Sequence, residues 1–359
     1  MSDAAAPTLI RSDYVVLGGG LVAVVLAGLA HYLDWGTVAP FLVSAVAVTL
    51  LASLVGRSVE QLGDRFGPGA TGVLQSALGN LPELFISLFA LKAGLVEVVR
   101  HALIGSILAN LLLVMGIAFT VGGLRHGSQR LDSQRARTIS VLMIVAVAAL
   151  VVPSLASYIH APAADHEKAL SDIASVVLLL LFALSLPAAL KRGSTGLSAE
   201  IAHEEPRWPV VLAVGLLAVA GVLAAFVSDW FVDALEPAMD SFGISDAFAG
   251  LVIVAIAGNA IENVVGVQLA ARNQSDYAFS LVINSPLQIT LVLAPALVIL
   301  SQVFGFAALT LVFSPLLVAA VVLAVLIAVV ITVDGESNWL EGVSLIAVYV
   351  VVAASFWWG

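Results

Sequence analysis

Long apolar runs separated by short polar segments recur along almost the whole chain. Each run holds on the order of twenty residues, the length that an α-helix needs to cross the hydrocarbon core of a bilayer. The pattern therefore predicts an all-α polytopic membrane protein with about eleven transmembrane helices. We expect these helices near residues 14–33, 36–57, 71–93, 97–121, 137–158, 171–190, 208–230, 246–271, 275–301, 307–333 and 340–358.

The composition supports insertion into a membrane. Hydrophobic residues fill 61% of the 359 positions and charged residues only 11%, whereas a typical soluble domain is about 25% charged. The mean hydropathy is +1.10. The chain has no cysteine, which excludes disulfides, iron–sulfur clusters and thiolate metal sites. We expect a lipid bilayer around the protein, no nucleic-acid partner, no catalytic residue or enzymatic activity and no resident cofactor; a homo-oligomer is an open alternative.

The positions of lysine and arginine predict the orientation, because cytoplasmic loops of membrane proteins are enriched in both residues. With the N-terminus in the cytoplasm, eleven of the 14 lysines and arginines fall on the cytoplasmic side. We therefore expect the N-terminus inside and the C-terminus outside. The short termini and the lack of a targeting segment favour a bacterial inner membrane. The eleven residues are Arg11, Arg57, Arg65, Arg125, Arg130, Arg135, Arg137, Lys191, Arg192, Arg207 and Arg272.

Two stretches carry the same polar signature inside apolar sequence. One runs from Gly79 to Glu83 and reads GNLPE; the other runs from Gly258 to Glu262 and reads GNAIE. A carboxylate at the centre of a bilayer costs roughly 2.5–3.5 kcal/mol on insertion scales. Because the chain takes on this cost twice in the same local context, we infer that both carboxylates act together, and that they bind a cation inside the membrane.

The two signatures belong to an internal repeat. At an offset of 179 residues, Gly79, Asn80, Glu83, Ile104, Ser106 and Leu112 meet Gly258, Asn259, Glu262, Ile283, Ser285 and Leu291. Just upstream, at an offset of 176, Glu60, Asp64, Phe66 and Gly67 meet Glu236, Asp240, Phe242 and Gly243. Two matches in the same order predict a duplication, because chance similarity between apolar helices would pair leucines and valines instead.

The repeat predicts the domain organisation. We expect an N-terminal span (1–33), a first repeat (34–190), a cytoplasmic linker (191–207) and a second repeat (208–359) within one membrane domain. Each repeat holds five of the expected spans, an odd number, so the second repeat should be inverted relative to the first. Inverted repeats with a site near the midplane are the architecture of secondary transporters.

The signatures offer oxygen ligands. Gly-Asn pairs, with Pro82 in the first copy, weaken helix continuity and can free backbone carbonyls. The amides of Asn80 and Asn259 then join the carboxylates of Glu83 and Glu262, which come from antiparallel helices. Calcium takes about 6–8 oxygen ligands. Since cysteine is absent and no histidine is near in sequence, zinc and copper are disfavoured.

Further ligands are expected on the spans that follow each signature. Ser106 and Asn110 lie at positions i and i+4, and Ser285 and Gln288 lie at i and i+3, so each pair shares one helix face. The alternative is hydrogen bonding between helices alone. A relay role for protons or cations is also open for Ser87, Glu60 and Glu236; for the two glutamates, a solvated interfacial face is the alternative.

The paired carboxylates also predict coupling. Two acidic groups close together at low dielectric constant favour protonation when no cation is bound, and a divalent cation restores the carboxylate form. Cation and protons then compete for one site, which is the minimal mechanism of an antiporter.

At these residues the chain resembles the calcium/proton antiporter family of the calcium/cation antiporter superfamily. The resemblance rests on GNLPE followed by IGSILAN in the first repeat, and on GNAIE followed by INSPLQ in the second. It implies an eleven-span fold and the exchange of cytosolic calcium for external protons by alternating access, with Glu83 and Glu262 as the central metal ligands. The alternatives are a sodium-coupled or other divalent-cation exchanger, a cation channel and a membrane scaffold without transport.

Overall fold

The computed structural model describes residues 8–33, 35–66, 74, 78–192 and 206–358. Helices dominate these residues, and two short strands pair antiparallel with Gln129 opposite Ser337. Among the helical elements, η1, η4 and η5 are π-helices and η2 is a 3-10 helix. In chain order the elements are α1 (Arg11–Tyr32), α2 (Val38–Phe66), α4 (Leu81–Lys92), α5 (Val96–Leu108), η1 (Ala109–Val114), α6 (Met115–His126), β1 (Gln129–Arg130), α7 (Ser133–Tyr158), η2 (Ala164–His166), α8 (Glu167–Arg192), α9 (Val210–Phe242), α10 (Asp246–Phe248), η4 (Ala249–Val254), α11 (Ala255–Gly258), α12 (Ala260–Ala271), α13 (Ser275–Gln288), η5 (Ile289–Leu293), α14 (Ala294–Val303), α15 (Pro315–Thr332), β2 (Glu336–Ser337) and α16 (Trp339–Ser355).

The prediction of an all-α polytopic membrane protein is confirmed. In the described part of the chain, 8 helices are long and apolar enough to cross a bilayer, or up to 9 if one bent pair forms a single span. The bent pair joins Asp246–Gly258 to Asn263–Ala271 at an angle of 61°. The two remaining predicted ranges contain the shorter helices α4, of 12 residues, and α16, of 17 residues.

The chain divides into two compact units. Unit 1 comprises Met1–Phe89 and Leu181–Phe242, and unit 2 comprises Ala90–Leu180 and Gly243–Gly359. Each unit takes residues from both predicted repeats, so the units do not follow the repeat boundaries, which stay a prediction. The linker predicted at 191–207 falls mostly outside the described residues.

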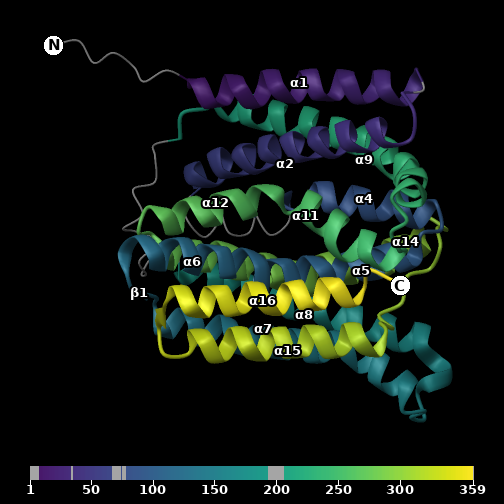
Figure 1. The fold of residues 1–359 in the computed structure, drawn as a ribbon, viewed down its shortest axis with the longest axis vertical. Coiled ribbons are helices and arrows are strands. Elements are labelled where there is room, and N and C mark those ends of the chain that lie inside the picture. The colour runs from purple at the N-terminus through teal and green to yellow at the C-terminus, as the bar shows by residue number, and fades with distance from the viewer. Residues whose placement is uncertain (1–7, 34, 67–73, 75–77, 193–205, 359) are drawn as a thin grey trace. The chain divides into compact units, whose positions relative to one another are not determined.

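Unit 1 is built from α1, α2 and α9, which pack against one another and lie adjacent in Figure 1. Their common core is apolar, and it also takes in leucines from the segment that leads into α4. The buried members are Val16, Leu54, Val55, Val59, Leu62, Trp208, Ala213 and Ala220.

Unit 2 depends on close helix crossings at glycine. A β-carbon on Gly105 of α5 would lie 2.2 Å from the backbone oxygen of Leu251 in η4, and one on Gly250 would lie 2.4 Å from the backbone oxygen of Val98. Small residues let helix backbones approach in this way, which is how helices gain packing energy inside a membrane.

Matching turns occur at the two places related by the 179-residue offset. Between α4 and α5, Gly94 has φ +86° and its amide donates to the carbonyl of Leu91 at 3.1 Å. Between α12 and α13, Asn273 has φ +62° and its amide donates to the carbonyl of Ala270, also at 3.1 Å. A left-handed residue that closes a helix is common because it satisfies the last carbonyls. The shared turn supports the duplication seen in the sequence.

One predicted span begins at the wrong residue. The apolar pattern predicts a helix over 307–333, but α15 begins at Pro315 and the preceding residues 306–314 are not helical. Alternate residues of this segment are nevertheless buried, with Leu309, Leu311 and Phe313 no more than 1% exposed. Apolar sequence alone does not distinguish a buried extended segment from a buried helix.

Serine side chains make the extended segment possible. The hydroxyl of Ser154 donates to the carbonyl of Leu311 at 3.0 Å and accepts from the amide of Phe313 at 2.9 Å. Ser171 accepts from the amide of Leu311 at 3.0 Å, and Ser301 accepts from that of Leu309 at 3.2 Å. Non-helical backbone at membrane depth is tolerated only where the protein itself supplies such partners.

Replacing Ser154 with alanine should therefore lower the thermal stability of the protein. The substitution leaves a buried donor and a buried acceptor without their partner, at about 1–3 kcal/mol for each group. The measurement is thermal unfolding of the purified protein in detergent. The matched control is Ser344→Ala, because Ser344 is exposed and its hydroxyl donates only to Leu340 of its own helix. Equal melting temperatures for the two variants would contradict this role of Ser154.

Candidate cation site

Four of the predicted site residues form one hydrogen-bonded network inside unit 2. The side-chain amide of Asn110 donates to Oδ1 of Asn259 at 3.1 Å and to the hydroxyl of Ser285 at 3.3 Å. Ser285 donates to the same Oδ1 at 3.0 Å, and Asn259 donates from Nδ2 to the hydroxyl of Ser106 at 2.9 Å. None of the four side chains is more than 4% exposed. The network joins α5, η1, the break between α11 and α12, and α13.

The helix break at Asn259 agrees with the reading of the Gly-Asn pair. The chain bends between α11 and α12, and Asn259 stands at the break with φ −98° and ψ 13°. Its Nδ2 group also donates to the carbonyl of Ala255 at 2.9 Å. The asparagine thus interrupts the helix and supplies its side chain to a carbonyl of the preceding turn.

The two serine-bearing helices share a second irregularity. The π-helix η1 begins three residues after Ser106 and includes Asn110, and η5 begins directly after Gln288. The 179-residue offset maps the bounds of η1 onto residues 288–293, which almost coincide with η5. Short π-helical insertions are rare and occur frequently at functional sites. Their positions agree with the duplication predicted from the sequence.

Asn110 presents an oxygen that the network does not use. Among the described residues, its buried Oδ1 atom has no hydrogen-bond partner. The amide cannot be turned around, because Oδ1 would then face the carbonyl of Ser106 and Oδ1 of Asn259, both of which are acceptors. In contrast, Asn259 donates both hydrogens and accepts twice. Among the four side chains of the network, Asn110 is therefore the one whose amide oxygen is open.

Unit 1 holds the first predicted carboxylate. Glu83 is 7% exposed and Ser87, one turn further along α4, is 5% exposed. Asn80 is half-buried just before α4 begins, and its carbonyl accepts from the amide of Leu84 at 2.9 Å. The segment thus buries a carboxyl and a hydroxyl on one face of a helix, in a chain with several membrane spans.

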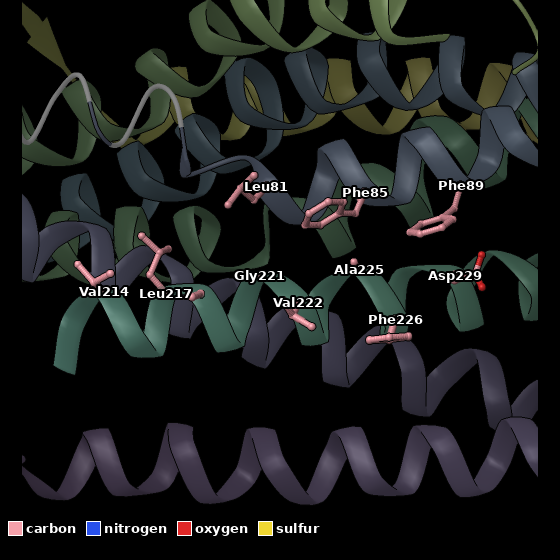
Figure 2. Close-up of a pocket in the computed structure, with 11 residues that line it drawn as sticks. Leu81, Phe85, Phe89, Val214, Leu217, Gly221, Val222, Ala225, Phe226 and Asp229 are labelled. Carbon is pink, nitrogen blue, oxygen red and sulfur yellow. The ribbon is translucent and has the colours of Figure 1, made fainter. Parts of the chain in front are cut away.

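The opposite face of α4 is apolar. Leu81, Phe85 and Phe89 project toward α9, as Figure 2 shows, and line a groove with a volume of about 670 Å³. Phe85 follows Glu83 by two residues, which places it about 200° around the helix. The groove wall across from them comes from α9 and ends at Asp229. Within Leu81–Phe89, the polar side chains of Glu83 and Ser87 therefore lie on a different face from the phenylalanines that line the groove.

The prolines of the two motifs occupy different places in their helices. Pro82 lies in the first turn of α4, where a backbone donor has no partner within the helix, so it starts the helix instead of breaking it. Pro286 lies inside α13, which continues to Gln288 and passes into η5. The hydroxyl of the buried Thr290 donates to the carbonyl of Pro286 at 2.7 Å. The sequence reading missed Thr290, although it is a lone hydroxyl in apolar sequence.

The other predicted site residues are Gln288, Glu60, Glu236 and Glu262. Gln288 is half-buried beside η5, and Glu60 of α2 and Glu236 of α9 are exposed. Glu262 lies in the first turn of α12, and its side chain is outside the described part of the structure. The cation-binding and relay roles of all these residues stay predictions.

The chain matches a family model described as "Sodium/calcium exchanger protein" over residues 37–191 and 212–358. The match covers most of the sequence and includes both signatures. The chain therefore belongs to this family of membrane exchangers, and the predicted membership of the calcium/cation antiporters is confirmed.

Individual relatives and solved structures match nearly the whole length of the chain. Over 350 residues the chain is 36% identical to the Ca(2+)/H(+) antiporter ChaA of Bacillus subtilis, covering 96% of this chain and 99% of the relative. It is 34% identical over 358 residues to a Ca(2+)/H(+) antiporter of Aphanothece halophytica, covering 94% and 95%. The solved structure of native YfkE superposes with a TM-score of 0.81 at 34% identity, covering 96% and 99%. The H+/Ca2+ exchanger CAX shares the fold, with a TM-score of 0.72 at 16% identity, covering 95% and 92%.

Replacing Asn259 with alanine should destabilise the protein strongly. The change removes the acceptor Oδ1 used by Ser285 and Asn110 and the donor Nδ2 used by Ser106 and the carbonyl of Ala255. Each buried group left unsatisfied costs about 1–3 kcal/mol. Thermal unfolding in detergent measures the loss, with the exposed Gln274→Ala as control. If the melting temperature of Asn259→Ala matches that of the control, the network does not hold the helix break together.

Proposed function

We propose that the chain is a secondary active transporter that exchanges calcium for protons across a membrane. What supports this most is that relatives named Ca(2+)/H(+) antiporters match almost the full length of the chain at 34–36% identity. The burial of Glu83 agrees with it, because a carboxyl buried in a membrane protein marks a functional site by default. Glu83 and Glu262 carry the charge of the exchange in this proposal.

The chemistry of exchange follows from where the carboxyl groups stand. A buried carboxyl favours its neutral, protonated form because burial penalises the charged form. A calcium ion that enters must displace the protons, and protons that return must displace the ion. Each transport direction therefore requires the other, without any covalent step or resident cofactor.

Neutral oxygens complete the proposed ligand set. Asn110 offers its open Oδ1 atom, and the hydroxyls of Ser106 and Ser285 lie in the same network. Asn80 and Gln288 are the further candidates. Calcium accepts such a mixture of carboxylate, amide and hydroxyl oxygens because it is a hard cation with flexible coordination.

The type of membrane and the orientation of the protein in it are also proposals. The chain is an integral membrane protein with bacterial relatives. We place it in a bacterial inner membrane with the N-terminus in the cytoplasm and the C-terminus outside, on the basis of the lysine and arginine distribution. In that orientation it would export cytosolic calcium in exchange for external protons.

Transport by purified protein in liposomes tests the function. An imposed pH gradient should drive calcium uptake in the absence of sodium, and Glu83→Gln or Glu262→Gln should each abolish it, because the amide cannot release a proton or carry the charge. The matched control is Glu336→Gln, which neutralises an exposed carboxylate next to β1 and should leave transport unchanged.

Two outcomes would count against the proposal. Uptake that requires a sodium gradient and ignores the pH gradient would favour a sodium-coupled exchanger, the reading suggested by the description of the family model. Normal uptake by both glutamine variants would remove the two carboxylates from the site.

A further inference from the structure

Trp208 is held by its backbone at the point where the chain returns from the linker region. Oε1 of Gln61 accepts from the amide of Arg207 at 2.8 Å and from the amide of Trp208 at 2.9 Å. The guanidinium of Arg65 donates twice to the carbonyl of Trp208, at 3.1 and 2.7 Å. Two side chains of α2 thus hold both backbone polar groups of one residue just before α9.

The first span supplies the third side of this arrangement. The carboxyl of Asp13 in α1 is 1% exposed and pairs with Arg57 at 2.8 Å and with Arg207 at 3.4 Å. It also accepts from the indole nitrogen of Trp208 at 3.4 Å and from the amide of Ile10 at 2.9 Å. Two cations and two neutral donors offset the burial of this carboxylate. We call Asp13, Gln61 and Arg65, together with the Trp208 that they hold, the Trp208 clamp.

The clamp leads to the predicted cation residues through apolar contacts. The side chain of Trp208 is 1% exposed and belongs to the core of unit 1. Leu78 and Leu81 pack against the same core, and they flank the Gly-Asn pair that contains Asn80. Glu83 follows Leu81 by two residues in the first turn of α4. The backbone that carries Asn80 and Glu83 is therefore flanked by two leucines that pack against the same core as Trp208.

We propose that the Trp208 clamp positions the first turn of α4, so that Asp13 and Gln61 are positioning residues for cation binding at Glu83. The inference rests on the proposed function and assigns a role to α1, the span that lies outside the sequence repeat. The clamp acts through successive packing contacts. Its hydrogen bonds hold the Trp208 side chain in the apolar core, and Leu78 and Leu81 pack against that core. A tightly packed interior transmits such displacements because it has little free volume.

Substitution of Gln61 tests the clamp with a matched rescue. Gln61→Leu removes the acceptor for the amides of Arg207 and Trp208, whereas Gln61→Glu keeps an acceptor oxygen at the same position. Calcium uptake into liposomes gives the KM for calcium and the maximal rate separately. We expect Gln61→Leu to raise the KM about tenfold, which corresponds to about 1.4 kcal/mol of lost binding, and Gln61→Glu to restore it. Gly56→Ala on the same helix is the control, because a β-carbon there meets no atom within 4 Å.

A second variant covers the case in which Gln61→Leu does not fold. Asp13→Asn keeps the shape of the side chain but removes its charge, and it should also raise the KM while leaving the maximal rate less affected. A double substitution with Leu81→Ala tests whether the clamp acts through Leu81. Residues that act through one another give non-additive effects on the KM. An unchanged KM in the folded variants, or strictly additive effects with Leu81→Ala, would overturn the inference.

Failure of the clamp and failure of the proposed function give different results. If Glu83→Gln abolishes uptake while the folded clamp variants keep a normal KM, the proposed role of Glu83 is supported and the clamp inference is wrong. If Glu83→Gln transports normally, the proposed site fails, and with it the link from the clamp to that site. A raised KM in the Gln61→Leu protein, rescue by Gln61→Glu and loss of transport in Glu83→Gln together support both.

Discussion

The requirement that buried polar groups find partners inside the protein organises the whole structure. Hydrocarbon offers no hydrogen bonds, so each unpaired backbone or side-chain group at membrane depth costs several kcal/mol. The buried segment at residues 306–314 meets this requirement with three serines. The amide network around Asn259 and the clamp around Trp208 meet it with side chains from helices distant in sequence. In these places side-chain hydrogen bonds supply partners that a regular helix does not provide.

The duplicated motif could be predicted from sequence because a glutamate in apolar sequence is conspicuous. The same reading anticipated Ser106, Asn110, Asn259 and Ser285, and the structure brings these four together. The start of α15 could not be predicted, because an apolar segment has the same composition whether it is helical or extended. The decisive partners of that segment, Ser154 and Ser171, lie about 140–160 positions earlier in the chain. Pairings over such distances leave no local signal in one sequence.

The effect of a proline on a helix depends on where in the helix the proline lies. Proline removes a donor and disrupts a helix when the donor was in use. At Pro82 the donor belongs to a first turn, where it has no partner within the helix. Near Pro286 the chain departs from α-helical geometry after the proline, as a π-helix. A π-helix of the same kind follows Ser106 in the first repeat without any proline. Since η1 forms without a proline, Pro286 is not required for a π-helix at this position.

A shared motif does not imply equal roles for its copies. Asn259 stands at a helix break with both amide groups engaged, so its contribution is to hold Ser106, Ser285 and Ala255 in place. The open oxygen belongs to Asn110, which the repeat aligns with Ile289, a residue that has no polar side chain. The proposed site therefore combines two matching carboxylates with unmatched neutral ligands. That asymmetry suits an exchanger, because a single asymmetric coordination sphere can be tuned at a neutral ligand without altering the paired acids that carry the charge.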